Sequence, residues 1–294
     1  MSARLVQRAS KTIGKTRQDQ DRPIMSTDVG QPRGVLHQRL EQGEFQHARR
    51  APTPALAGLV EHYWSVSWDL RGLPAQQQET LPHPNVQFVV EPGLTAIYGV
   101  HTGRFIRQLE GKGCVFGIKF KAGGFFPFYR ASVSNVMDGS LEPSRVFGDD
   151  ALRFERDVFA SVDIDAMSTA AERLLLAHLP PSDPNVAHVS TWVSSIATDR
   201  SLTSVEELAS RTGLTKRALQ RLFNQYVGVG PKWVITRYRL HEAVAQLQAG
   251  TPIVWTELAL ALGYFDQAHF IRDFRKLVGR SPTEYVRSEG KPGR

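Results

Sequence analysis

The sequence predicts an α+β multidomain chain, with an N-terminal β-rich sandwich or barrel domain that also carries helices and a C-terminal all-α domain. Three observations predict this fold class. Short apolar runs separated by Gly and Pro fill residues 51–120, a pattern typical of small β-sandwiches and barrels. The run Pro180-Pro181-Ser182-Asp183-Pro184 stops an apolar helix and indicates a linker. Downstream of this linker, one helix-turn-helix pattern occurs twice.

The composition limits the classes of protein that fit this chain. A length of 294 residues allows about two domains. Cys114 is the only cysteine, which excludes an intramolecular disulfide and a multi-cysteine metal site, and its apolar neighbours predict a buried, inert thiol. No apolar run approaches the ~20 residues of a membrane span, and residues 1–23 lack the apolar core of a secretory signal. We therefore expect a cytoplasmic protein without membrane contact.

We predict four segments along the chain. Residues 1–45 mix Arg, Lys, Gln, Ser and Asp and read as a disordered basic tail, which is either simply solvated or adds nonspecific attraction to DNA. Residues 46–146 form the β-rich, sensor-like domain, residues 147–184 a helical segment and linker, and residues 185–290 the helix-turn-helix domain. Charge follows this division: residues 51–184 carry 11 Lys and Arg against 15 Asp and Glu, whereas residues 185–294 carry 15 against 9. Such a distribution is expected if only the C-terminal part meets phosphates.

The regular elements are predicted in order from apolar periodicity. Strands are expected within residues 56–68, 86–90, 96–100, 105–109 and 115–120. Helices are expected over residues 149–160, 165–179, 185–198 and 231–249, the last ended by Gly250-Thr251-Pro252. The apolar face of the helix at 165–179 either packs within the chain or forms a dimer surface, and both readings remain open.

The second helix-turn-helix pattern is the more distinctive of the two. Gly263 can adopt the left-handed conformation that ends a helix, and Asp266 suits the N-cap of the next one. Phe270 and Phe274 recur at helical spacing, which predicts a buried stripe. The first unit has the same layout, because these pairs correspond: Leu208 and Leu258, Gly213 and Gly263, Thr215 and Asp266, Leu219 and Phe270, Phe223 and Phe274, Gly228 and Gly279, Pro231 and Pro282.

On these motifs the chain resembles the AraC/XylS family of transcription regulators, from about Asn185 to Arg287. The most specific part is the second unit, Gly263-Tyr264-Phe265 through Phe274-Arg275-Lys276 to Gly279-Arg280-Ser281-Pro282-Thr283-Glu284-Tyr285. The resemblance implies a double helix-turn-helix domain that binds DNA and an upstream sensor or partner-binding domain. It also implies that the second helix of each unit is a recognition helix, which enters the major groove.

The resemblance and the chemistry of the side chains predict which residues contact DNA. Arg can donate two bonds to guanine, and Gln can match adenine. By resemblance, the base-reading residues are Arg217, Gln220, Arg221, Gln267, His269 and Arg272, whereas Ala268 departs from the polar residue often found at its position. Phosphate contacts are expected from Thr215, Lys216, Lys232, Arg275, Lys276 and Arg280.

Other constellations carry weaker signals. Trp64, Trp68, Tyr98 and Phe116 could line an apolar ligand pocket or simply belong to a core. His62, His83 and His101 match no compact metal motif, so we expect structural roles and no metal or cofactor.

We therefore expect a sequence-specific transcription regulator, an activator in the family's commoner mode, that is controlled through its N-terminal domain. Its expected partners are double-stranded promoter DNA, RNA polymerase, a small-molecule effector and a second copy in a homodimer. Two alternatives are a ligand-independent architectural DNA-binding protein and an enzyme domain fused to a DNA-binding module. The upstream half shows no acid/base pair, nucleophile triad or metal motif, so we do not expect an enzyme.

Overall fold

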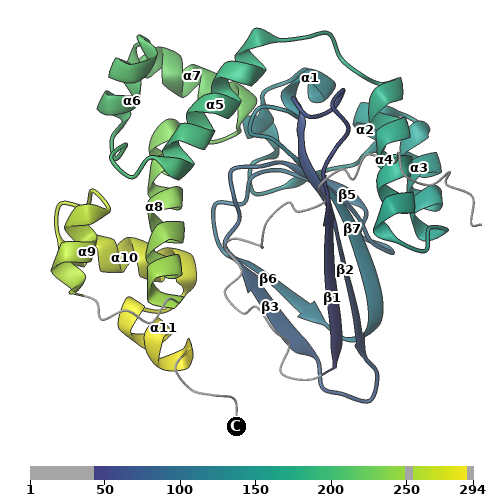
Figure 1. Cartoon of the computed structure of the whole chain (residues 1–294), viewed down its shortest axis with the longest axis horizontal. Helices are drawn as coiled ribbons and strands as arrows, with labels where there is room; N and C mark the ends of the chain where they lie inside the picture. The colour runs from purple at the N-terminus through teal and green to yellow at the C-terminus, as the bar shows by residue number, and fades with distance from the viewer. Residues whose placement is uncertain (1–42, 249–253, 290–294) are drawn as a thin grey trace, which may run out of the picture.

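The computed structural model describes residues 43–248 and 254–289, and it confirms the predicted fold class (Figure 1). The elements of the N-terminal half are β1 Glu44–Arg50, β2 Val60–Leu70, β3 Gln76–Thr80, β4 Gln87–Val90, β5 Ala96–Tyr98, β6 Phe105–Leu109, β7 Gly111–Phe120, α1 Phe126–Tyr129, the 3₁₀ helix η1 Val133–Val136, β8 Ser140–Leu141, α2 Ser144–Phe147, α3 Asp150–Phe159 and α4 Ile164–Ala177. Those of the C-terminal half are α5 Pro184–Thr198, α6 Val205–Thr212, α7 Lys216–Tyr226, α8 Pro231–Gln248, α9 Trp255–Ala261, α10 Gln267–Val278 and α11 Pro282–Glu289. Within the described ranges, no helix has the length and apolar character needed to span a membrane.

The N-terminal half is built on an antiparallel sheet with the strand order β1-β2-β7-β4-β5-β8. Because side chains alternate along a strand, Tyr63, Phe88 and Phe116 share one face, against which α3 and α4 pack (Figure 1). Phe154 of α3 meets the ring of Phe88 edge-on at 5.1 Å between centroids. The apolar core of this half therefore lies between the sheet and the two helices.

Strands β3 and β6 form a separate two-stranded ribbon, called the β3–β6 ribbon below. It lies on the side of the sheet away from α3 and α4 (Figure 1). Leu109 at one end of the ribbon packs with Trp68 and Leu70 of β2 in a small apolar cluster. The ribbon thus covers part of the sheet face that the helices leave free.

The C-terminal half is organised along α8. Val234 and Ile235 near its start pack into the apolar core of the first helix-turn-helix unit. Leu240, Val244 and Leu247 near its end pack into the core of the second unit. One continuous helix therefore belongs to both cores and fixes the spacing between the two units.

Both of these cores also contain residues of the N-terminal half. Val100 and Ala122 are buried in the cluster of the first unit, and Leu81 is buried in the cluster of the second. The two halves of the chain are consequently packed against each other through apolar side chains.

Several details differ from the sequence predictions. Strand β1 begins at Glu44, within the segment that we predicted to be a disordered tail, because its backbone pairs with β2 along its whole length. Strand β3 was not predicted, and the predicted strand at 115–120 begins at Gly111. Cys114 is exposed rather than buried, although partial desolvation still raises the pKa of its thiol. Residues 1–42 and the predicted stop at Gly250-Thr251-Pro252 lie outside the described residues.

Candidate nucleic-acid interface

The first helix-turn-helix unit consists of α6, a turn at Gly213 and α7. Gly213 has φ +68°, the left-handed conformation that we predicted for the end of this helix. The hydroxyl of Thr215 accepts a hydrogen bond from the backbone N–H of Ala218, which confirms the predicted N-cap. Leu219 and Phe223 are fully buried, so the opposite face of α7 points to solvent.

The second unit repeats this construction with α9, Gly263 and α10. The carboxylate of Asp266 accepts from the N–H of His269 at 2.6 Å, as predicted for the N-cap. Phe270 and Phe274, the counterparts of the two apolar residues of the first unit, are also fully buried. Gly263 has φ +80°, which supports the predicted turn. The duplicated pattern in the sequence therefore corresponds to a duplicated structure.

The predicted base-reading residues differ in their surroundings. Arg217, Arg221 and Arg272 are exposed, and among the described residues none of their guanidinium groups has a hydrogen-bond or ion-pair partner. Gln220 is exposed and donates to the side chain of Asn224 at 3.0 Å. The guanidinium groups of these three exposed arginines are therefore available for contacts with guanine.

The two remaining base-reading candidates lie at the start of α10 and are half-buried. The ring of His269 packs edge-on against Tyr264 at 5.2 Å between centroids, and its Nε2 lies 3.6 Å from a carboxylate oxygen of Asp273. Gln267 is the first residue of α10, and its side chain has no hydrogen-bond or ion-pair partner among the described residues. His269 is therefore held by its neighbours, whereas Gln267 can turn toward a ligand.

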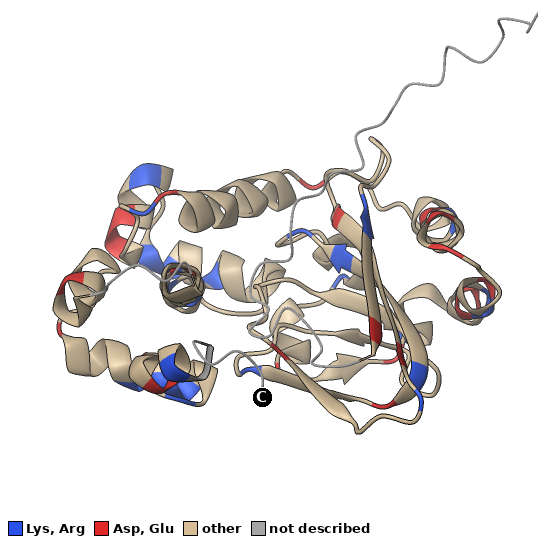
Figure 2. Cartoon of the chain, turned by 60° about the horizontal axis from the view of Figure 1, so that its bottom comes forward, with Lys and Arg blue, Asp and Glu red and all other residues tan. Residues whose placement is uncertain are grey.

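Lys and Arg stand beside Asp and Glu in both units (Figure 2). Lys216 at the start of α7 forms an ion pair with Glu206 of α6. Lys232, Arg275 and Lys276 are exposed, and among the described residues no side-chain hydrogen bond or ion pair holds them. The three free cations can neutralise phosphates without breaking an existing contact.

Arg280, the sixth predicted phosphate contact, is in a different position. It is half-buried between α10 and α11, and its guanidinium lies 3.3 Å from a carboxylate oxygen of Glu79 in strand β3. Its guanidinium carbon also lies 5.6 Å from the ring centre of Tyr285. In this arrangement Glu79 of the N-terminal half forms an ion pair with Arg280, the residue that we expected to contact a DNA phosphate.

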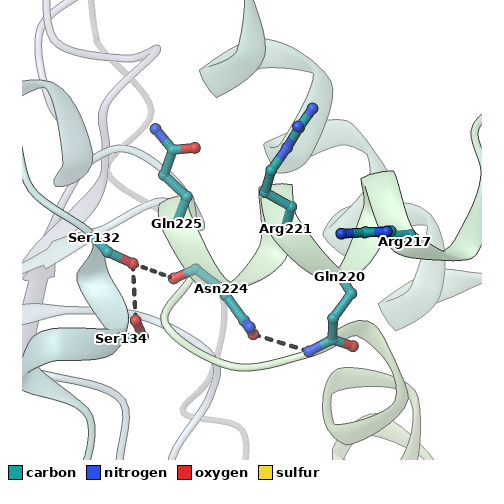
Figure 3. Close-up of a pocket in the computed structure, with 7 residues that line it drawn as sticks. All are labelled: Ser132, Ser134, Arg217, Gln220, Arg221, Asn224 and Gln225. Carbon is teal, nitrogen blue, oxygen red and sulfur yellow. Dashed lines mark hydrogen bonds between the residues drawn. The ribbon is translucent and has the colours of Figure 1, made fainter.

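An open, shallow pocket of about 670 Å³ lies between η1 and α7 (Figure 3). The hydroxyl of Ser132 donates to the backbone carbonyl of Asn224 at 3.2 Å, so η1 contacts the last turn of α7. The side chains that line the pocket are Ser132, Ser134, Arg217, Gln220, Arg221, Asn224 and Gln225. The N-terminal half thus reaches the edge of the surface that would face a base pair.

Three of the four predicted ligand-binding residues lie on the sheet face away from α3 and α4. The indole rings of Trp64 and Trp68 lie against Gly117 and Gly113 of β7, where an added Cβ would come within 2.2 Å of each ring. Trp64 Nε1 donates to Gln87 at 3.0 Å, and Tyr98 pairs in register with the same glutamine. All three side chains are partly exposed or at the margin of burial.

Phe116 does not join the other three aromatic residues. It is 1% exposed, points to the opposite face of the sheet and stacks on Tyr63 at 6.2 Å between centroids. Phe116 and Gly117 are neighbours in β7, and neighbouring side chains of a strand point to opposite faces of the sheet. Phe116 therefore points into the core, away from the face that carries Trp64.

Sequence reasoning missed the residues that join the two halves. Arg237 of α8 is 2% exposed and donates to the backbone carbonyl of Thr102. Burial lowers the pKa of Arg237 to about 10, against a smaller opposing effect of Asp138. The sequence places Arg237 at an inward-facing position of α8, which indicates a buried arginine that needs a partner. The sequence does not identify that partner, because Thr102 lies 135 residues away.

The histidines that might have suggested a metal site do not come together. His62 is buried in β2, and His83 stacks on His241 at 4.3 Å between ring centroids. In the part of the chain that the structure describes, there is no group of three or more His, Cys, Asp or Glu that could hold a metal ion.

Two family models match the chain. One, described as a domain of unknown function (DUF6597), matches residues 48–142, and the other, described as a helix-turn-helix domain, matches residues 208–288. The HTH-type transcriptional activator AarP of Providencia stuartii is 31% identical over 104 residues, which make up 35% of this chain and 75% of AarP. The HTH-type transcriptional activator RhaS of Escherichia fergusonii is 31% identical over 103 residues, or 35% of this chain and 36% of RhaS. The chain therefore spans most of the first relative but only about a third of the second.

Solved structures are also similar to the chain, among them the following two. The C-terminal domain of AraT, a response regulator from Geobacillus stearothermophilus, is 27% identical, with 33% of this chain and 82% of that one covered and a TM-score of 0.31. ToxT from Vibrio cholerae, solved with an unsaturated fatty acid bound, is 9% identical, with 85% and 96% covered and a TM-score of 0.35.

Proposed function

The chain belongs to the AraC/XylS family of transcription regulators, and we propose that it is a sequence-specific activator that binds promoter DNA through both recognition helices. The observation that carries this proposal is the duplicated unit, in which each recognition helix is capped and buries two large apolar residues at matching positions. Each helix then turns free arginine side chains toward solvent. A helix with this layout fits the major groove of B-DNA, where every base pair shows a distinct set of donors and acceptors.

We propose that the contacts with DNA divide into two classes. Arg217, Gln220, Arg221, Gln267, His269 and Arg272 read base edges. Thr215, Lys216, Lys232, Arg275 and Lys276 contact phosphates, which position the protein without specifying a sequence. Lys216 would exchange its partner Glu206 for a phosphate when DNA binds. Because α8 holds the two units at a fixed spacing, one chain would address neighbouring major grooves and read an asymmetric site.

We propose that the segments upstream of the DNA-binding domain serve regulation. Residues 46–146 would form the sensor domain, residues 147–184 a helical segment and linker, and residues 185–290 the DNA-binding domain. An activator of this kind would meet RNA polymerase at the promoter and would act in the cytoplasm, where the chromosome is. Leu152, Phe159 and Leu176 are exposed on α3 and α4, and this surface would serve a homodimer.

The sheet face that carries Trp64, Trp68 and Tyr98 is our candidate for effector binding. The rings of Trp64 and Tyr98 are half-buried on this face, and Gln87 between them offers a polar group for orientation. A small, largely apolar effector fits this chemistry. A thermal-shift screen of such compounds with full-length protein tests the site, because a stabilising compound should lose its effect on Trp64→Ala. A shift that survives this substitution would place the effector elsewhere.

The DNA-binding function can be tested with the full-length protein and a random pool of duplex DNA. Repeated selection should enrich a site with two blocks about 10 base pairs apart, one for each recognition helix. Binding of the enriched site should then exceed binding of a scrambled duplex by about 10³-fold or more at physiological salt. A ratio near one would contradict the proposal and favour an architectural DNA-binding protein.

A further inference from the structure

The segment that connects β7 to β8 is the part of the N-terminal half that packs along the recognition helix α7. The ring of Phe126 in α1 lies 4.2 Å from the ring of Tyr226, between centroids, at the end of α7. Val133 of η1 is fully buried and lies so close to Gly228, just past α7, that a Cβ added there would come within 3.1 Å of it. Tyr226 is 5% exposed, so this contact excludes water. The apolar packing therefore fixes η1 beside the last turn of α7.

Two serine hydroxyls make the polar part of this contact. Ser132 donates its one hydroxyl proton to the backbone carbonyl of Asn224 at 3.2 Å, and its oxygen lies 2.8 Å from the hydroxyl of Ser134. Ser134 must then be the donor in the second bond. The proton of Ser134 can turn to an incoming acceptor while Ser132 keeps its hold on α7. A phosphate oxygen can therefore be bound by Ser134 without loosening η1.

The side chains around these serines form an open pocket that suits an anion. Besides the two serines, its lining consists of Arg217 and Arg221 of α7 and three amide side chains (Figure 3). Every one of these side chains can donate a hydrogen bond, and none of them is a carboxylate. Neither arginine has a side-chain partner among the described residues. This chemistry fits the oxygen-rich, negatively charged sugar–phosphate backbone of DNA.

The charge of the connecting segment agrees with an anionic ligand. Residues 51–184 carry 11 Lys and Arg against 15 Asp and Glu, yet residues 111–137 contain no Asp or Glu. The charged residues of this stretch are Lys112, Lys119, Lys121 and Arg130. The next carboxylate, that of Asp138, accepts from the backbone N–H and the hydroxyl of Thr102. A strand of phosphates along this segment would thus meet cations and hydroxyls rather than carboxylates.

Arg130 is the cation nearest to η1 in the sequence, two residues before Ser132. It ends α1 in the left-handed conformation, with φ +55°, where glycine is the residue that costs least. It is exposed, and among the described residues no partner holds its guanidinium. Two residues of chain span at most about 7 Å, so a side chain of this length can reach a strand that passes the pocket. A non-glycine residue kept in a costly conformation indicates that its side chain has a use.

The place of η1 relative to α7 decides which part of the DNA it would meet. The major groove is about 12 Å wide, and an α-helix with its side chains has a diameter of about 10–12 Å. A recognition helix therefore fills the groove and has a sugar–phosphate strand along each flank. An element packed against the flank of the helix, as η1 is, meets that strand and not the base edges.

We propose that the DNA-binding surface of the first unit includes this segment of the N-terminal half, with Arg130 and Ser134 as contacts to phosphates of the strand that flanks α7. This inference rests on the proposed DNA-binding function. Arg130 neutralises one phosphate, and Ser134 turns its hydroxyl from Ser132 to the same strand. Neither residue reads a base, so both add affinity and position α7 in its groove without specifying a sequence. The first unit would then be completed, on the DNA, by residues from both halves of the chain.

Arg130→Gln in the full-length protein tests this assignment, because glutamine keeps much of the length of the side chain and removes its charge. The matched control is Arg145→Gln. Arg145 is also exposed and without a side-chain partner among the described residues, but it belongs to α2, beside α3 (Figure 1). Binding of both variants and of the parent to the enriched site, called the selected site, and to a scrambled duplex would be measured over a range of salt concentrations. Ethylation interference, which reports the loss of binding when a single phosphate is ethylated, would locate the contact on the selected site.

We expect Arg130→Gln to bind both duplexes about tenfold more weakly than Arg145→Gln, an effect typical of losing one hydrogen bond to a charged group. The slope of log affinity against log salt should fall by about one, because one phosphate contact is lost. Ethylation of one phosphate should weaken binding of the parent but not that of Arg130→Gln. This phosphate should lie beside the base pair at which Arg221→Ala relaxes the preference. Ser134→Ala should weaken binding to both duplexes about threefold and leave the salt slope unchanged.

Equal affinities and salt slopes of Arg130→Gln and Arg145→Gln would overturn the proposal, and so would an interfering phosphate beside the block that α10 reads. Titration of the free parent with inorganic phosphate tests a competing use of the pocket. Saturable binding that is lost in Ser134→Ala, while DNA binding by this variant is unchanged, would assign the pocket to a small anion and would also overturn the proposal. If the parent itself binds the selected and scrambled duplexes alike, the proposed function fails first. The two failures are therefore distinguishable.

Discussion

At the scale of single residues, the difference between a base contact and a phosphate contact can be measured directly. Arg272 is exposed on α10, and Lys276 lies one helical turn further along, where it is exposed as well. Both are cations without a side-chain partner among the described residues, so their surroundings in the free protein are alike. Their proposed roles nevertheless differ, because only a guanidinium in the groove can form two bonds to guanine.

We expect Arg272→Ala to cost ~1–3 kcal/mol of binding free energy on the selected site and to relax the preference at one base pair. Lys276→Ala should weaken selected and scrambled duplexes alike and lower the salt slope by about one. Fluorescence anisotropy with a set of singly substituted duplexes measures both effects. Equal losses on selected and scrambled DNA for Arg272→Ala would contradict its assigned role.

His62 allows a second prediction at this scale, about stability. It is 4% exposed, and burial lowers its pKa to about 3, with further lowering by the nearby charges of Lys119, Arg49 and His47. The imidazole is therefore neutral in the folded protein, whereas in the unfolded chain it takes up a proton near pH 6.5. Because the unfolded state gains the proton first, the free energy of unfolding should fall as the pH drops below about 6.5.

We expect His62 to lower the free energy of unfolding by about 1 kcal/mol at pH 5.5 relative to pH 7.5. Urea unfolding of the parent and of His62→Gln at both pH values measures it, because the variant lacks the titrating group and should lose less stability. Other histidines contribute equally to the two proteins, so the difference isolates His62. An identical loss in both proteins would show that the ring accepts a proton without unfolding.

At the scale of elements, local sequence patterns predicted those helices and turns whose conformation depends on neighbouring residues in the sequence. The helices of both units, their caps at Thr215 and Asp266 and the positive φ at Gly213 and Gly263 agree with the sequence predictions. Each of these features depends on residues within one or two turns of the chain. Apolar spacing and capping chemistry therefore predict them without knowledge of the rest of the molecule.

Strands β1 and β3 could not be predicted in the same way. Strand β3 has the sequence Gln76-Gln77-Gln78-Glu79-Thr80, which contains no apolar residue, and it exists because it pairs with β6 from 25 to 33 residues downstream. The single buried side chain in this strand is Glu79, and it is buried by arginines that the local sequence does not reveal. Apolar periodicity does not predict elements that form only because they pair with residues far away in the sequence. The same holds for Arg280, whose partner lies 201 residues away.

The N-cap of α10 provides a prediction for this scale. Asp266→Ala removes the acceptor for the N–H of His269 and should lower the free energy of unfolding by about 1 kcal/mol. Asp266→Asn should cost much less, since Asn caps a helix nearly as well as Asp. Chemical denaturation of the three proteins measures the difference. Equal destabilisation by Ala and Asn would mean that the charge of Asp266 matters rather than the hydrogen bond.

At the scale of the whole molecule, the N-terminal half and the two helix-turn-helix units share their cores. Val100 and Ala122 complete the apolar cluster of the first unit, and Leu81 completes that of the second. Burial of this kind couples the stability of the two halves, because separating them would expose apolar surface on both sides. The chain should therefore unfold as one cooperative body rather than as two independent domains.

Leu81→Ala tests this coupling at a single position. Truncation of a fully buried leucine typically lowers the free energy of unfolding by about 2–5 kcal/mol. Here the cavity would open inside the core formed by α8 to α11, although Leu81 precedes those helices by more than half of the chain. Amide hydrogen exchange should therefore accelerate in α9, α10 and α11 as well as in the β3–β6 ribbon. Leu73→Ala is the matched control, because Leu73 is 37% exposed and lies in the connection between β2 and β3. If exchange accelerates only in the ribbon while α10 keeps its protection, the second unit is stable without Leu81, and the proposed coupling of the two halves is wrong.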